Sequence, residues 1–259
     1  MTYITRPGGK TYQADDIVKH ILPRLLASNY TYCEPFFGGG NIFFHLKRTI
    51  PKLRAILGDI NDDLANFWIM ATEHGSELAH LIEHSVTSEE LFNYYKMTPP
   101  EDPLLRAYAF YYIVTSSLYG KAEFGSGTFK KQSGKDGSIP NAARREFVSA
   151  VQFLDKSIFF HSDFEEVINR ALAINSKTMI YVDPPYYGTE FYYHGKPFGK
   201  VDHERLFHML DGKNFVASYG KNAYIEELYR DYEILDISRA SMLSEKNKRM
   251  DELIILGHL

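Results

Sequence analysis

Seven short runs of apolar, β-branched and aromatic residues recur along the chain, and stretches with the period of a helix separate them. This alternation is typical of a mainly parallel sheet with helices on both faces. The predicted strands are residues 31–34, 54–57, 157–160, 179–183, 214–218, 232–237 and 252–256. We therefore expect an α/β fold built on seven mostly parallel strands.

One long stretch, residues 63–155, separates the second and third predicted strands and shows little strand character. It is too long for a simple crossover, so we expect an inserted, mainly helical lobe. Its most apolar helix is predicted at residues 102–116, and a loop or hairpin rich in glycine, serine and lysine follows at 120–138. Residues 1–62 and 156–259 would then form one domain that carries this insertion.

The charge of the chain is unevenly distributed. A net charge of −4 over 259 residues argues against a protein that coats nucleic acid indiscriminately. Residues 120–145 nevertheless contain six lysines and arginines against two acidic residues, and residues 239–249 form a second basic cluster. Such clusters are either solvated surface or a nucleic-acid footprint.

Nothing in the sequence predicts a membrane protein or a secreted one. No run of about eighteen apolar residues occurs, and the N-terminal residues have no apolar signal region. We expect a cytoplasmic protein that does not bind membranes. The single cysteine, Cys33, is expected to be a buried packing residue.

A glycine-rich turn, residues 34–41 (EPFFGGGN), follows the first predicted strand. Glycines there allow a sharp turn and close approach to a ligand, at the strand end where nucleotides bind in parallel sheets. Glycine turns also arise merely to pack a helix on a strand. Asp59 ends the next predicted strand, where its carboxylate could accept hydrogen bonds from ribose hydroxyls. The pair predicts an adenosine-bearing cofactor, either a nicotinamide dinucleotide or S-adenosylmethionine.

The segment Asp183-Pro184-Pro185-Tyr186 distinguishes between these two possible cofactors and favours S-adenosylmethionine. It follows an apolar strand, and two consecutive prolines make a rigid turn that cannot continue a ladder. If Asp183 and the carbonyl of Pro184 each accept one hydrogen of an exocyclic amino group, its nitrogen lone pair becomes available to attack a sulfonium methyl group. Tyr186 offers a face on which a flipped base can stack. The alternative is a strand-terminating turn with a surface tyrosine.

Taken together, these motifs resemble those of the DNA adenine-N6 methyltransferases of the Dam-like, or D12, class. The matching segments, in the order of that family, are residues 6–10 (RPGGK), 34–40 (EPFFGGG), 58–61 (GDIN), 161–164 (HSDF), 183–186 (DPPY) and 247–253 (NKRMDEL). The resemblance implies a Rossmann-like fold, S-adenosylmethionine as cofactor, and a flipped adenine of double-stranded DNA as substrate.

The resemblance also implies roles for individual residues. The catalytic residues would be Asp183, Pro184, Pro185 and Tyr186. The residues that bind the cofactor would be Arg6, Lys10, Phe36, Gly38, Gly40, Asp59, Asp163, Phe164 and Asp183. Within this set, Asp163 would accept from the cofactor's adenine amino group, and Lys10 would lie near its methionine end or the bound base.

In this family the target-recognition lobe lies where the helical insertion and the basic residues 120–145 fall. We expect DNA contacts from Tyr119, Lys121, Lys130, Lys131 and Arg144. The lysines suit phosphates, and Tyr119 or Phe124 could wedge into the base stack. Residues 117–131 depart from the Phe-Asn-x-Pro stretch of better-known members, so a GATC specificity cannot be transferred.

Three alternatives remain at this level. His80, Glu83 and His84 fit the H-x-x-E-H pattern of a zinc peptidase helix, although that pattern is short, and we expect no metal site. The chain could be a methyltransferase-like module that only binds nucleic acid. It could also methylate another amino group, such as cytosine N4, a base in RNA or an amide nitrogen. We expect a monomer or a weak dimer; the recognition sequence and any restriction partner stay open.

Overall fold

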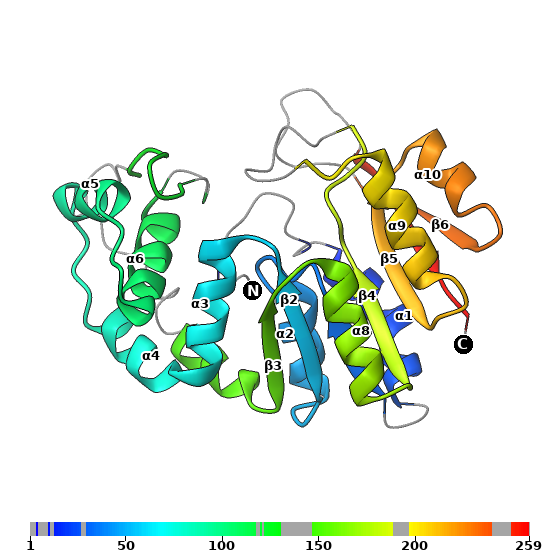
Figure 1. Cartoon of the computed structure of the whole chain (residues 1–259), viewed down its shortest axis with the longest axis horizontal. Coiled ribbons are helices and arrows are strands. Elements are labelled where there is room, and N and C mark those ends of the chain that lie inside the picture. The colour runs from blue at the N-terminus through cyan, green and yellow to red at the C-terminus, as the bar shows by residue number, and fades with distance from the viewer. Residues whose placement is uncertain are drawn as a thin grey trace. The chain divides into compact units, whose positions relative to one another are not determined.

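The computed structural model describes residues 4, 10, 13–26, 30–117, 120, 122–130, 147–188, 197–239 and 250–258 (Figure 1). Its strands are β1 (Thr31–Glu34), β2 (Ala55–Asp59), β3 (Ser157–His161), β4 (Thr178–Val182), β5 (Phe215–Gly220), β6 (Glu233–Arg239) and β7 (Met250–Leu256). They form a seven-stranded sheet in the order β3-β2-β1-β4-β5-β7-β6. Each predicted strand is confirmed, and no strand end differs from the prediction by more than two residues.

The direction of the strands is mixed only at one edge of the sheet. β1 pairs with β4, β4 with β5, and β2 with β3, all in parallel. β7 runs antiparallel to both of its neighbours, β5 and β6. The predicted α/β class with a mostly parallel, Rossmann-like sheet is therefore confirmed.

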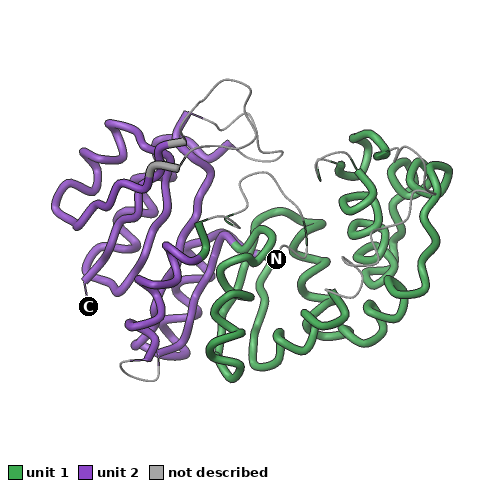
Figure 2. The backbone as a smooth tube through the Cα atoms, turned by 180° about the vertical axis from the view of Figure 1, so that it is seen from behind, with its two compact units in different colours: residues 1–14, 37–161 green, residues 15–36, 162–259 purple. Residues whose placement is uncertain are grey.

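The chain divides into two compact units, residues 1–14 with 37–161 and residues 15–36 with 162–259 (Figure 2). The first unit contains β2 and β3, the 3-10 helix η2 (Gln152–Leu154), and the helices α2 (Asn41–Thr49), α3 (Asp62–Glu73), α4 (Gly75–Glu83), α5 (Glu89–Met97) and α6 (Pro103–Ser116). In its described part between residues 63 and 155 there is no strand, only isolated bridges that join Ser117 to Phe129 and Glu123 to Ser126. The predicted helical character of this stretch is confirmed.

Helix α6 shows why this stretch folds as it does. Asp102 caps the helix through its side chain, which accepts from the N–H of Leu105, and Pro103 occupies the first turn. Nine of its residues are buried, so it is apolar nearly all round, as expected of a central helix. α3, α4 and α5 pack against it.

The second unit contains β1, β4, β5, β6 and β7, with α1 (Ala14–Leu26), α8 (Phe164–Ile174), α9 (Lys200–Leu210) and α10 (Ala223–Leu228). All residues of β1 and β4 are buried, as expected of central strands covered on both faces, and the continuous apolar run of β4 reflects this. Cys33 lies within β1 with no exposed surface, and burial raises the pKa of its thiol. Its predicted role as a packing residue is confirmed.

No helix in the described ranges is both long enough and apolar enough to cross a membrane. The assignment of residues 63–155 as an inserted recognition domain concerns function and stays a prediction.

Candidate functional site

The glycine turn of the first unit is tied to the end of β2. The N–H of Gly38 donates to Oδ2 of Asp59 over 2.9 Å, and the N–H of Asn61 donates to Oδ1 over 3.0 Å. These two hydrogen bonds fix the orientation of the carboxylate. The structure thus brings together two predicted cofactor residues, Gly38 and Asp59.

Both glycines of the predicted site adopt left-handed backbone angles, with φ of 51° at Gly38 and 69° at Gly40. A Cβ atom at Gly40 would lie 2.6 Å from Cζ of Phe37 and 2.8 Å from Cε2 of Phe44. A Cβ atom at Gly38 would meet no atom of the described structure within 4 Å. Gly40 is therefore required for packing, whereas Gly38 faces open space that a ligand could use.

Trp68 of α3 also contacts the glycine turn. Its indole Nε1–H donates to the carbonyl of Gly38 over 2.9 Å. The ring is fully buried and packs edge-on against Phe37, at 5.0 Å between centroids. Sequence reasoning missed this contact, because a buried tryptophan in a helix carries no signal of a bond to a distant turn.

Two predicted cofactor residues of the second unit, Phe36 and Phe164, stack on each other. Their ring centroids are 5.4 Å apart and their planes 25° apart. Phe198 completes the group, with its ring edge toward Phe36 at 5.5 Å. Phe164 as a whole residue is only 3% exposed, so its ring packs within this aromatic group.

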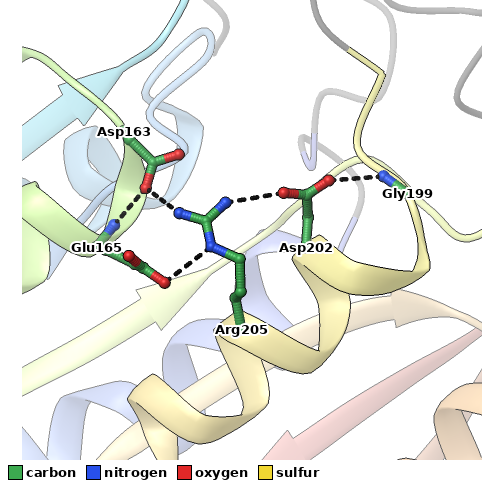
Figure 3. A network of polar contacts seen from close by, with 5 residues as sticks. All are labelled: Asp163, Glu165, Gly199, Asp202 and Arg205. Carbon is green, nitrogen blue, oxygen red and sulfur yellow. Dashed lines mark hydrogen bonds and ion pairs between the residues drawn. The ribbon is translucent and has the colours of Figure 1, made fainter.

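Asp163 precedes Phe164 and is held by several contacts (Figure 3). Its Oδ1 accepts from the N–H of Glu165 and from Nη2 of Arg205, each over 3.0 Å. Arg205 also donates to Glu165 and Asp202 at 2.9 and 2.8 Å. The hydrogen bond to Glu165 raises the pKa of Arg205 further above its usual value.

Asp183 directly follows β4, and two hydroxyl groups, hydrogen-bonded in series, hold its carboxylate. Ser218 of β5 donates from Oγ to Oδ1 of Asp183 over 2.9 Å. The Tyr181 hydroxyl lies 2.9 Å from the same Oγ. Because the proton of Ser218 is used on the carboxylate, Tyr181 must be the donor to Ser218. Both hydroxyl-bearing side chains are buried, at 1% exposure.

Within the rest of the predicted catalytic segment, Tyr186 lies against Gly220 at the end of β5. Pro184 is buried, and Pro185 and Tyr186 are partly exposed. A Cβ atom at Gly220 would lie 2.7 Å from Cδ2 of Tyr186, so the absence of a side chain there lets the tyrosine ring rest on the strand. Tyr187 packs against Tyr224 at 4.6 Å, which further fixes the turn.

The two basic residues predicted near the cofactor differ in what the structure describes. Lys10 is buried, at 5% exposure. Arg6 lies outside the described residues.

Residues 7–243 match the family described as D12 class N6 adenine-specific DNA methyltransferase. The chain belongs to this family. It is therefore an adenine-specific DNA methyltransferase, which methylates adenine N6 in DNA. Methyltransferases of this kind use S-adenosylmethionine in general.

Three relatives align with nearly the whole chain at low identity. The Type II methyltransferase M.CviBI of Paramecium bursaria Chlorella virus NC1A is 23% identical over 97% of this chain and 95% of its own length. The DNA adenine methylase of Vibrio cholerae is 25% identical over 96% and 93%. A Type II methyltransferase of Lactococcus lactis subsp. cremoris is 24% identical over 93% and 92%.

Sequence reasoning missed the residues that support the family's motifs from elsewhere in the second unit. Helix α9 supplies two of them at its start, Arg205 and the buried His203, whose ring lies 4.8 Å from Phe198. β5 supplies Ser218 and Gly220. The only sequence signal is the position of α9 just after an aromatic, glycine-rich stretch.

One of the five predicted DNA contacts lies in the described part of the chain. Lys130 is exposed, and its backbone N–H donates to the carbonyl of Ser116 at the end of α6. Phe124, the predicted wedge, lies under the guanidinium of Arg106, at 4.8 Å from its ring centre. Tyr119, Lys121, Lys131 and Arg144 lie outside the described residues.

Changing Lys130 and Lys131 together to alanine should weaken DNA binding and flatten its salt dependence. Each lost phosphate contact lowers the slope of log K against log salt by about 0.9. The slope can be measured by fluorescence anisotropy between low and moderate salt. Exposed Lys52 and Arg54, before β2, give a control that removes the same charge. If both double variants show the same slope of log K against log salt, the proposed DNA contacts of Lys130 and Lys131 are contradicted.

The alternative of a zinc helix finds no support in the geometry. His84 caps α4, and its Nδ1 lies 2.9 Å from the carbonyl of His80. Among the described residues no group of three or more His, Cys, Asp or Glu side chains could hold a metal ion.

Proposed function

We propose that this enzyme transfers the methyl group of S-adenosylmethionine to N6 of an adenine flipped out of double-stranded DNA, at a specific recognition site. The observation that carries the proposal is the fixed carboxylate of Asp183, held at the end of β4 by Ser218. A methyltransferase that acts on an amino group needs an acceptor in a defined position, and this carboxylate supplies one.

The residues present fit the cofactor in three respects. Asp59 is oriented by two backbone N–H groups and would hold the ribose hydroxyls. Gly38 leaves open space above the turn. Asp163 and the N–H of Phe164 offer one acceptor and one donor, which complement the amino group and the ring nitrogen of an adenine. Lys10 and Arg6 remain proposed contacts of the methionine end.

The cofactor supplies an electrophilic methyl group on a sulfonium centre. Asp183 accepts one hydrogen of the adenine amino group, and the carbonyl of Pro184 accepts the other. Both bonds would draw the nitrogen toward tetrahedral geometry and expose its lone pair to the methyl carbon. As the N–CH3 bond forms, the S–CH3 bond would break to leave S-adenosylhomocysteine, and the surplus proton of the methylated amine would pass to Asp183 or to water. The two prolines keep these acceptors in place without ladder hydrogen bonds. Electrostatic preorganisation of this kind is usually a large part of catalysis.

Tyr186 would receive the flipped base on its ring face. Stacking of a base on an aromatic side chain contributes about 1–3 kcal/mol. The contact with Gly220 holds one side of the tyrosine, and the residue is partly exposed, so a base could reach it. We propose residues 63–155 as the recognition insertion, with Tyr119, Lys121, Lys130, Lys131 and Arg144 toward the DNA.

The direct test is methyl transfer by the purified protein. With labelled S-adenosylmethionine and unmethylated duplex DNA, label should appear as N6-methyladenine after digestion and mass spectrometry. A duplex in which every adenine already carries the N6-methyl group should take up none. Label found only in RNA, in protein or on cytosine N4 would overturn the proposal. Sequencing the modified bases would then give the recognition site.

A further inference from the structure

Arg205 is the centre of the most extensive ion-pair network in the described part of the second unit (Figure 3). It lies on the second turn of α9 and donates to Asp163, Glu165 and Asp202 through three different nitrogens. Asp202 in turn accepts from the N–H of Gly199 through its other oxygen, at 2.9 Å. The network therefore joins the first turn of α8 to the start of α9.

The two carboxylate oxygens of Asp163 differ in their hydrogen bonds. Oδ1 accepts from both Arg205 and the N–H of Glu165, whereas no hydrogen bond from the described residues reaches Oδ2. In Figure 3, both dashed lines of Asp163 end on one oxygen, and the other oxygen carries none. Two donors on one oxygen fix the plane of the carboxylate, and with it the direction in which Oδ2 can accept.

Arg205 also fixes the neighbour of Asp163. Its guanidinium lies over the Phe164 ring, 4.9 Å from the centroid. A planar guanidinium can serve three carboxylates and an aromatic face together, which a lysine ammonium cannot do. One side chain thus holds both members of the proposed adenine-binding pair.

The contribution of these ion pairs to fold stability is too small to explain the arrangement. The side chains of Arg205, Asp163 and Glu165 are 37%, 43% and 37% exposed. Ion pairs with such exposure contribute little to stability. Their geometric effect on Asp163 does not depend on that contribution.

We propose that Arg205 is a positioning residue for the cofactor's adenine: by holding Asp163, it aims Oδ2 at the adenine amino group and so sets the preference for adenine over hypoxanthine. The inference rests on the proposed use of S-adenosylmethionine. A hypoxanthine presents a carbonyl oxygen in place of the amino group, and that oxygen would face Oδ2 as acceptor against acceptor. The alternative is that Arg205 only fastens α8 to α9.

The test compares the binding of S-adenosylhomocysteine and S-inosylhomocysteine by titration calorimetry. We expect the wild-type protein to prefer the adenosyl compound by up to about 100-fold, since the inosyl compound loses a hydrogen bond to the charged Asp163 carboxylate and sets two acceptors against each other. Arg205→Met should reduce that preference by about 10-fold, through weaker adenosyl binding and nearly unchanged inosyl binding. The double variant with Asp163→Ala should show no further loss of preference beyond Asp163→Ala alone.

Arg170→Met is the matched control. Arg170 also pairs with a glutamate of α8, Glu166, at 2.6 Å and is half exposed, but it is not bonded to Asp163. Its preference should equal that of the wild type. If Arg205→Met weakens both compounds equally, or leaves the ratio unchanged, the positioning role is wrong. If the wild-type protein binds neither compound, the proposed cofactor fails instead, which is a different result.

Discussion

Replacing Asp183 with alanine should lower the rate of methyl transfer by about 1000-fold or more, because the acceptor proposed to activate the adenine amino group is lost. The fold should persist, since Asp183 lies beyond the end of β4 and is partly exposed. The rate is best measured in single turnover with both substrates saturating. Binding of S-adenosylhomocysteine, measured by calorimetry, should change little.

Ser218→Ala gives a graded comparison for this prediction. It keeps the carboxylate but removes the hydroxyl that donates to Oδ1. A hydrogen bond to a charged group contributes about 1.5–3 kcal/mol, so the rate should fall by at least about 10-fold, less than in Asp183→Ala. If Asp183→Ala abolishes cofactor binding as well, Asp183 serves mainly the cofactor and the proposed catalytic role is wrong.

The second large effect is expected on stability. Gly40→Ala should lower the free energy of unfolding by about 3 kcal/mol. A left-handed backbone costs a residue with a Cβ about 1–2 kcal/mol, and overpacking against the buried rings of Phe37 and Phe44 adds about 1–3 kcal/mol. The melting temperature should fall by roughly 5–12 °C for a chain of this size.

Gly38→Ala is the matched variant, because it has the same backbone class and a Cβ that would enter open space. It should lose only about 1 kcal/mol of stability, yet bind S-adenosylhomocysteine at least about 10-fold more weakly, since its methyl group occupies room proposed for the cofactor. Cofactor binding as tight as in the wild type would show that the ligand does not approach this turn. A wild-type melting temperature for Gly40→Ala would show that the aromatic cluster relaxes.

The fold was largely predictable because its strands are buried runs that stand out from their surroundings. β4 is buried at every position, and a continuous apolar run bounded by turn residues indicates such a strand. The antiparallel direction of β7 was not predictable. The apolar pattern of a strand is the same in either direction, and the direction follows from where the chain returns.

The candidate site was predictable where chemistry is concentrated in short segments. Asp183 and Tyr186 belong to one four-residue segment, and the glycine turn precedes Asp59 by a spacing that suits a nucleotide site. The supporting residues were not predictable. Arg205 lies 42 residues from Asp163, and Ser218 lies 35 residues from Asp183. Such contacts between different elements leave no periodic trace in the sequence.

The bond between Trp68 and Gly38 gives the enzyme a built-in optical probe. Trp68 is the only tryptophan in the sequence, so the tryptophan emission of the protein comes from one indole. That indole donates its N–H to the carbonyl of the glycine turn. A ligand that settles on the turn changes the electrostatic environment of this single emitter. If the cofactor binds on this turn as proposed, its binding should change the intensity and wavelength of the intrinsic fluorescence, without a label and without a substitution.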